Sequence, residues 1–377
     1  MRFFDNTTIN RTYVHAALQT FAENVGGIFV FVYLIKAGFT VPQVFAAISA
    51  IFFARILSRQ IVLPIVKRIG LRNGLILGTL LVSLSYLLLT AVNGIGPMLV
   101  VFILFDGIST AFYWTCHHAY VAKLGDVENR GAQVSAREAI NAVMSIIAPL
   151  VGSFLLIYAG PFYAFATAAV IEALAVLPLI SAPNFNILPN AVLEPKTKRH
   201  ASLLFFTDGL ITSCNFFVWV IALFQTLGSK FGSFGGAIAF AGLVGAVMSL
   251  GVGRMIDLGH HKRSVQIAYG AMALTILLKA FSFSTPWSAV AVSAFGAAIF
   301  PIYMPVLMSR IYNMAKASAC PLRFKIATEG AWDLGTGIGC LTAAALTWFG
   351  FSYFWPLLLG LIGCLAGYRL IQSKAFQ

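Results

Sequence analysis

Long apolar blocks recur along the whole chain and constrain its fold more than any other feature. A helix needs about 20 residues to cross the hydrocarbon layer of a bilayer, and these blocks have that length. Hydrophobic residues fill 59% of the 377 positions and charged residues only 10%, which is too little charge to cover a water-facing surface. The sequence therefore predicts an all-α membrane protein.

Glycine, proline and charge clusters divide the chain into twelve predicted transmembrane helices. They cover residues 13–36, 42–64, 73–93, 97–121, 138–159, 161–182, 202–227, 233–256, 264–283, 286–312, 325–348 and 351–370. Lysine and arginine test this count, because short loops that hold them stay on the cytoplasmic side. Loops on one side hold 20 of these cations, and loops on the other side hold only Lys36 and Lys230. One span more or fewer would destroy this asymmetry, so we predict a multi-pass protein of the cell inner (plasma) membrane with both termini cytoplasmic.

The two halves of the chain repeat one another. Residues 21–23 (Phe-Ala-Glu) in the first span match residues 206–208 (Phe-Thr-Asp) in the seventh, each with an acid inside an apolar block. Residues 136–138 and 327–329 match in the same way, before the fifth and the eleventh span. Internal repeats of this kind are typical of transporters. The predicted parts are a first six-helix half at 1–182, a cytoplasmic linker at 183–201 and a second six-helix half at 202–377.

A glycine, an acid and a basic pair stand close together after the eighth span, where residues 253–263 read Gly-Arg-Met-Ile-Asp-Leu-Gly-His-His-Lys-Arg. This segment resembles the signature GxxxDRxGRR of the major facilitator superfamily, and the resemblance extends over essentially the whole chain. In the first half Lys67 stands where the family has Asp. The resemblance implies two pseudo-symmetric six-helix bundles around a central cavity. It also implies a gating loop with Gly253, Asp257 and Arg263, in which Asp257 alone serves as the latch.

Charged residues inside the predicted spans are the first candidates for function, because each costs at least ~2.5–3.5 kcal/mol at the bilayer centre. They are Glu23, Arg55, Arg59, Asp106, Glu172, Asp208, Lys279 and Asp333. Two of the acids begin polar stripes at helical spacing. The stripes are Asp106, Thr110, Tyr113 and His117, and Asp208, Thr212, Asn215 and Trp219. By the resemblance, both stripes line the substrate or proton path together with Glu23 and Gln19; the alternative is that they only hydrogen-bond neighbouring helices.

Arg55 and Arg59 lie one helical turn apart, and two buried cations need carboxylate partners or an anionic ligand. A structural pair with Glu23 or Asp333 and a role in substrate binding both stay open. Structural roles are predicted for Glu172, Lys279, Glu138 and Glu329.

Buried acids that gain and lose protons offer a route to proton coupling. The predicted function is a secondary active transporter of a small polar or charged solute, with alternating access and with the substrate, direction and coupling ion open. One alternative is a non-transporting membrane assembly factor or receptor. A second is a copper importer with the soft donors Cys116, His117, His118, Met304 and Met308.

The sequence contains no signature of an enzyme or of a nucleic-acid-binding protein. The sequence has no P-loop, HExxH or GxSxG motif, so no enzyme is predicted. The net charge of +13 is spread over short loops, so nucleic acid is not an expected partner. The expected partners are the lipid bilayer and a small-molecule or ion substrate, bound by a monomer without a cofactor or a resident metal.

Overall fold

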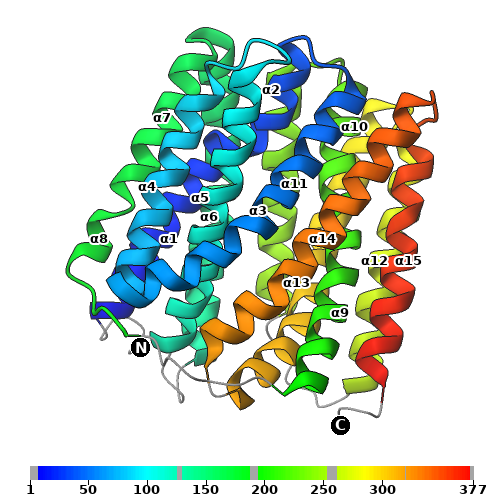
Figure 1. The fold of residues 1–377 in the computed structure, drawn as a ribbon. Helices are drawn as coiled ribbons and strands as arrows, with labels where there is room; N and C mark the ends of the chain where they lie inside the picture. The colour runs from blue at the N-terminus through cyan, green and yellow to red at the C-terminus, as the bar shows by residue number, and fades with distance from the viewer. Residues whose placement is uncertain (1–6, 125–129, 187–193, 253–260, 319, 374–377) are drawn as a thin grey trace.

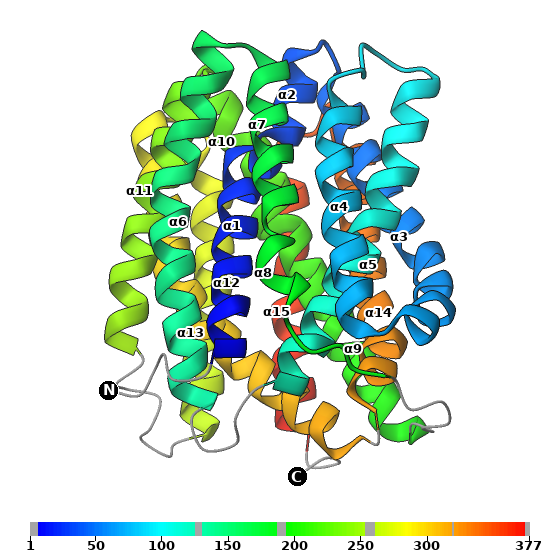
Figure 2. The same cartoon turned by 90° about the vertical axis from the view of Figure 1, so that its left-hand side faces the viewer.

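The structure is a computed structural model that describes residues 7–124, 130–186, 194–252, 261–318 and 320–373. Long helices run side by side in one bundle, and the start of the first and the end of the last lie at the same end of it (Figures 1 and 2). The first half holds α1 (Thr7–Val25), η1 (Gly27–Phe29), α2 (Val30–Lys36), α3 (Val41–Ile69), α4 (Leu71–Leu89), α5 (Pro97–Leu124), α6 (Arg130–Tyr158), α7 (Pro161–Leu174) and α8 (Leu177–Ile180). The second half holds α9 (Pro195–Thr212), η2 (Ser213–Val218), α10 (Trp219–Thr226), α11 (Phe231–Val252), α12 (His261–Ser282), α13 (Pro286–Ala317), α14 (Pro321–Trp348) and α15 (Phe354–Gln372).

Eleven helical segments of the described chain are long and apolar enough to cross a membrane. The prediction of an all-helical, multi-pass membrane protein is thereby confirmed. α14 coincides with the eleventh predicted span but is not one of these segments, because polar residues such as Glu329 and Asp333 lower its mean hydropathy. The count of twelve spans stays a prediction.

Three spans that were predicted as continuous helices are interrupted: the first, the sixth, where residues 175–176 separate α7 from α8, and the seventh. In the first, α1 ends at Val25 and a 3-10 turn, η1, precedes α2. Gly26 and Gly27 stand at this break, and glycine is a poor helix former. In the seventh, the π-helical turn η2 separates α9 from α10. The breaks of the first and seventh spans follow closely after an acid, Glu23 in the first span and Asp208 in the seventh.

The start of α9 also differs from the sequence prediction. The helix begins at Pro195, inside the segment predicted as a linker. Proline suits the first position of a helix, because its fixed φ is helical and its missing N–H would have no partner there. Part of the segment predicted as a linker is therefore helical, and its role as a linker stays a prediction.

The packing of helices follows a simple scheme. In the first half α1 packs on α6 and α7, α4 packs on α5 and α7, and α3 packs on α5. In the second half α9 packs on α14 and α15, α12 packs on α13 and α15, and α11 packs on α13. The halves meet where α3 and α5 contact α14 and where α6 contacts α11. Aromatic side chains add to this contact, since the ring of Phe29 lies 5.6 Å from that of Phe234.

The contact between α9 and α14 depends on glycines that let the two backbones approach closely. A Cβ on Gly335 would collide with the carbonyl oxygen of Phe206, and one on Gly209 would collide with that of Trp332. We expect Gly335→Ala to destabilise the protein by about 1–3 kcal/mol through overpacking, measured as thermal unfolding in detergent. Gly236→Ala on α11 is the control, because nothing lies within 4 Å of a Cβ there. Equal unfolding temperatures for the two variants would refute the close-packing account.

Candidate functional site

A buried network of charges joins the two halves at the contact between α3 and α14. Arg59 Nε donates to Asp333 Oδ2 at 2.6 Å, and Arg59 Nη1 donates to Glu329 Oε2 at 3.1 Å. Arg55 Nε lies 3.2 Å from the other oxygen of Asp333. Both arginines and both acids are less than a tenth exposed. Ion pairs in such surroundings interact strongly but have lost their hydration, so the network holds together only as a complete set.

Two more side chains extend this network. Lys325 Nζ lies 3.1 Å from Glu329 Oε1, one turn away on α14. Arg59 Nη1 also donates to the hydroxyl of Thr115 on α5, at 2.9 Å. The Nη2 atom of Arg59 is buried and has no hydrogen-bond partner in the described part of the chain. The network therefore offers one free donor group to an acceptor such as an anionic or carbonyl group.

Trp332 connects the network to Asp208 in the second half. Its Nε1–H donates to Asp208 Oδ2 at 2.9 Å, and its ring lies 5.6 Å from the guanidinium carbon of Arg55. Tyr303 on α13 donates its hydroxyl to the other oxygen of Asp208 at 2.8 Å. Asp208 is thus buried with a donor on each oxygen. The indole ring of Trp332 therefore contacts both Asp208 and Arg55.

The stripe predicted on α5 faces neighbouring helices of its own half. Asp106 accepts a hydrogen bond from the hydroxyl of Ser85 on α4 at 3.0 Å, and the Thr110 hydroxyl donates to the Asp106 carbonyl at 2.6 Å. The Tyr113 hydroxyl lies 3.4 Å from His117 Nδ1 on the same helix. It lies equally far from a ring nitrogen of His15 on α1. Asp106 is half-buried, so it is the more open of the two stripe acids.

The stripe predicted on α9 continues into the π turn. Asn215 accepts two hydrogen bonds from Lys279 Nζ on α12, one through its side chain and one through its carbonyl oxygen, each at 2.8 Å. The ammonium group also lies 5.2 Å from the ring of Trp219, whose Nε1–H donates to Ser293 on α13. Thr212 lies half-buried at the end of α9. Lys279 therefore binds to Asn215 in the π turn rather than to an acid.

Several predicted site residues lie apart from this network or outside the described structure. Glu23 on α1 accepts a hydrogen bond from Gln19 at 2.9 Å and is half-buried just before the helix break. Arg263 is exposed at the start of α12. Gly253 and Asp257 of the predicted gating loop lie outside the described residues, as does the side chain of Glu138. The gating loop therefore stays a prediction.

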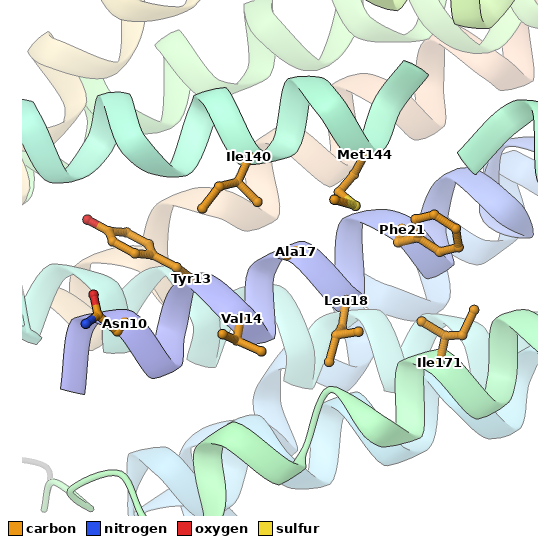
Figure 3. A pocket seen from close by; sticks show the side chains of 9 residues that line it. All are labelled: Asn10, Tyr13, Val14, Ala17, Leu18, Phe21, Ile140, Met144 and Ile171. Atoms are coloured by element: carbon orange, nitrogen blue, oxygen red, sulfur yellow. The ribbon is translucent and has the colours of Figure 1, made fainter. Parts of the chain in front are cut away.

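A groove of about 600 Å³ opens between α1, α6 and α7 (Figure 3). Apolar side chains line almost all of it. The lining residues are Asn10, Tyr13, Val14, Ala17, Leu18, Phe21, Ile140, Met144 and Ile171. None of the site residues predicted from the sequence is among them.

The copper alternative finds no support in the described side chains, among which no group of three or more His, Cys, Asp or Glu residues is arranged to hold a metal. The rings of His117 and His118 lie 5.7 Å apart and 73° from parallel. Neighbouring residues of a helix point in different directions, so these two imidazoles are not oriented toward one common metal ion.

A buried charge network joins two packed halves of a helical bundle whose apolar segments are long enough to cross a membrane. The sequence profile of the Major Facilitator Superfamily matches residues 9–339, so the chain belongs to this superfamily. The resemblance stated from the residues is confirmed, and the chain is a transporter-family protein and not an enzyme. A search of curated proteins gave no match.

Solved structures of two transporters share the fold. A D-xylose-proton symporter is 15% identical with a TM-score of 0.70, and 96% of each chain is covered. The human organic anion transporter MFSD10 (TETRAN) is 16% identical with a TM-score of 0.62, covering 97% of this chain and 99% of the other. At such identities the likeness extends to the fold and leaves the solute open.

Proposed function

We propose that the chain is a secondary active transporter that moves a small polar or charged solute across the cell inner membrane, coupled to protons. Twelve spans in two pseudo-symmetric halves, residues 1–182 and 202–377, would alternate access around a central cavity. Both termini would be cytoplasmic and the protein would act as a monomer. The lipid bilayer and the solute are its proposed partners, and the gating loop with Gly253, Asp257 and Arg263 is proposed to lie between the eighth and ninth spans.

One observation carries this proposal: a buried or half-buried acid lies just before a helix break at matching places of the two halves. Glu23 precedes the break at η1, and Asp208 precedes the π turn η2. Interrupted helices at corresponding positions of an internal repeat are the best structural pointer to a transporter's binding site. A protein that kept this fold but no longer transported a solute would have no need of such acids, because each charge is costly in a membrane.

The helix contacts support the duplication. The contacts of α1 with α6 and α7 correspond to those of α9 with α14 and α15. The helices of the second set belong to the spans six places later in the chain. The contact of α4 with α5 and α7 corresponds in the same way to that of α12 with α13 and α15. The contact of α3 with α5 corresponds to that of α11 with α13.

The proposed path runs between the two stripes and past the inter-half network. Asp106, Thr110, Tyr113 and His117 belong to its first-half wall, and Asp208, Thr212 and Asn215 belong to its second-half wall. Glu23, Arg55 and Asp333 complete the proposed set. The free donor of Arg59 beside Asp333 favours a solute with an acceptor group, such as a carboxylate or a hydroxyl.

Transport by proteoliposomes tests the proposal. A thermal-shift screen against metabolite classes would first supply a ligand, since a compound that binds only the folded state raises its unfolding temperature. Asp106→Asn and Asp208→Asn are expected to abolish uphill uptake of that ligand under a proton gradient and to leave exchange intact. Glu194→Gln is the control, because Glu194 is exposed before α9. Unchanged uphill uptake in both aspartate variants would refute proton coupling through these acids.

Alternating access separates a carrier from a non-transporting membrane protein of the same fold. Cysteines placed by Thr110→Cys and Thr212→Cys should react with membrane-impermeant reagents from both sides of the membrane, and added ligand should change the two rates in opposite directions. Labelling from one side only, with or without ligand, would favour the assembly factor or receptor.

A further inference from the structure

Glu172 on α7 is an acid that the site described above does not use. Its side chain is 0% exposed, and neither carboxylate oxygen has a hydrogen-bond partner in the described part of the chain. An ionised carboxylate without a partner in such surroundings costs several kcal/mol. The Glu172 carboxyl group therefore holds a proton in this conformation.

Glu23 on α1 and Tyr86 on α4 are the groups that face Glu172 from neighbouring helices. The charge of Glu23 acts directly on Glu172, and the charges of both acids act on Tyr86. Gly27 lies beside Tyr86 and Glu23, because a Cβ there would be 3.1 Å from the Tyr86 hydroxyl and 3.2 Å from Glu23 Cγ. Asp106 on α5 also acts on Tyr86. α6, the remaining long neighbour of α7, contributes no acid, lysine, arginine or histidine among its side chains from 140 to 158.

Glu23 and Glu172 therefore form a pair of neighbouring acids. Neither forms a salt bridge within the described residues. Two carboxylates in one apolar site cannot both ionise cheaply, so the pair binds at least one proton and titrates as a unit.

The other buried acids of the bundle differ from this pair in their partners. Asp208 accepts one hydrogen bond on each oxygen, and Asp106 accepts one from Ser85. Hydrogen-bond donors stabilise an ionised carboxylate. Glu172 has no such donor, so it is the buried acid whose charge is least compatible with the conformation described.

The pair also lies at the break of the first span. Gly26 packs against Ala168, one turn before Glu172 on α7, and a Cβ on Gly26 would lie 3.4 Å from the ring of Tyr86. A change of angle between α1 and α2 at Gly26 and Gly27 would therefore move Glu23 relative to α7. Water that reaches the pair in another conformation would restore the hydration that an ionised Glu172 lacks here.

We propose that Glu172 and Glu23 form a proton-binding site that holds the coupling proton while the bundle is closed around it. One proton adds to a carboxylate oxygen of the pair and cancels one negative charge. The proton leaves as hydronium when water reaches the pair from the other side of the membrane. The site rests on the proposed function for its role in transport, but its proton binding is measurable without any solute.

Infrared spectroscopy of the purified protein tests the site. Titration of the wild type with base should remove the carbonyl band of a protonated, buried carboxylic acid. Glu172→Gln should lack one such band from the start, whereas Glu194→Gln, which changes an exposed acid, should keep it. Glu23→Gln should lose the Glu172 band at lower pH than the wild type, because the negative charge that favours the protonated form of Glu172 is gone. An unchanged band in Glu172→Gln would overturn the site even if that variant folds less well.

Transport then separates failure of the site from failure of the proposed function. With the ligand found by thermal shift, Glu172→Gln should lower uphill uptake to the level seen without a proton gradient and should keep exchange. Full uphill uptake in Glu172→Gln would overturn the role of this site in proton coupling. Uptake by the wild type would still support the proposed transport function. An infrared band that depends on Glu172 in a protein without wild-type transport would uphold the site and refute the function. Uptake driven by sodium, with no proton dependence, would assign a different ion and overturn the proposal.

Discussion

Asp333→Leu is expected to destabilise the protein by about 3–5 kcal/mol, the typical cost of removing one partner from a buried ion network. The change removes the ion pair of Arg55 and leaves Arg59 with Glu329 and the Thr115 hydroxyl, while both guanidinium groups stay buried. Thermal unfolding of the purified protein in detergent, followed by tryptophan fluorescence, measures the loss.

Two further variants show whether the unpaired charges cause this loss. Thr115→Val removes one hydrogen bond from Arg59 but no charge, so we expect a smaller loss of stability. The triple variant R55M/R59M/D333L removes the unpaired cations together with the acid and leaves Glu329 paired with Lys325. Replacing buried ion pairs by apolar residues is often neutral. The triple variant should therefore unfold at a higher temperature than Asp333→Leu alone. If both unfold alike, the loss comes from packing around Asp333 and not from charge.

The position of the network gives this prediction a bearing on transport. Arg55 and Arg59 belong to the first half, and Asp333 and Glu329 belong to the second. Any motion that separates α3 from α14 at this depth must break the ion pairs between them. Water or the solute must then replace the lost partners, because bare charges are too costly in a low dielectric. Separation of the two halves at this contact therefore requires that water or solute enter and bind the charges of the network.

The sequence predicted which positions carry the charges but not how they pair. A charge inside an apolar block is conspicuous because of its cost, and Arg55, Asp208 and Asp333 were found in this way. The partners of these charges are separated by many helices, and their pairing is set by tertiary packing. For Arg55 the sequence left Glu23 and Asp333 as alternatives, and the structure pairs it with Asp333.

Neutral partners left even less signal. Tyr303 and Trp332, which donate to Asp208, are aromatic residues of a kind that is common in membrane helices. His15, which lies beside Tyr113, is a single polar residue in the first span and forms no recognisable motif. Trp332 directly precedes Asp333, so its neighbour could have drawn attention to it. The sequence predicts structural roles for Glu172 and Lys279 but indicates no partner for either. Burial without a partner, which distinguishes Glu172, is visible only in three dimensions.

The helix breaks were predictable in one half only. Gly26 and Gly27 are adjacent glycines inside an apolar block, a recognisable weak point of a helix. The π turn at Ser213–Val218 contains neither glycine nor proline. Its carbonyl at Asn215 binds the buried ammonium of Lys279, a contact from another helix. Local sequence does not reveal a turn that depends on such a tertiary contact.

Asn215→Ala is expected to destabilise the protein by about 1.5–3 kcal/mol, the usual worth of a buried hydrogen bond to a charged group. Lys279 is 5% exposed, and within the described residues it forms no salt bridge. The variant leaves its ammonium group with the Asn215 carbonyl oxygen and the face of Trp219. Thermal unfolding in detergent, with Thr342→Val on exposed α14 surface as the control, measures the effect.

The double variant K279M/N215A decides whether the buried charge is the cause. Methionine fills much of the space of lysine and needs no hydrogen bond, so the asparagine side chain loses its importance once the charge is gone. The double variant should therefore be more stable than Asn215→Ala alone, although it carries one substitution more. Additive losses would show that Lys279 and Asn215 stabilise the bundle independently. In that case the π turn of the seventh span would not depend on the ammonium group that binds to it.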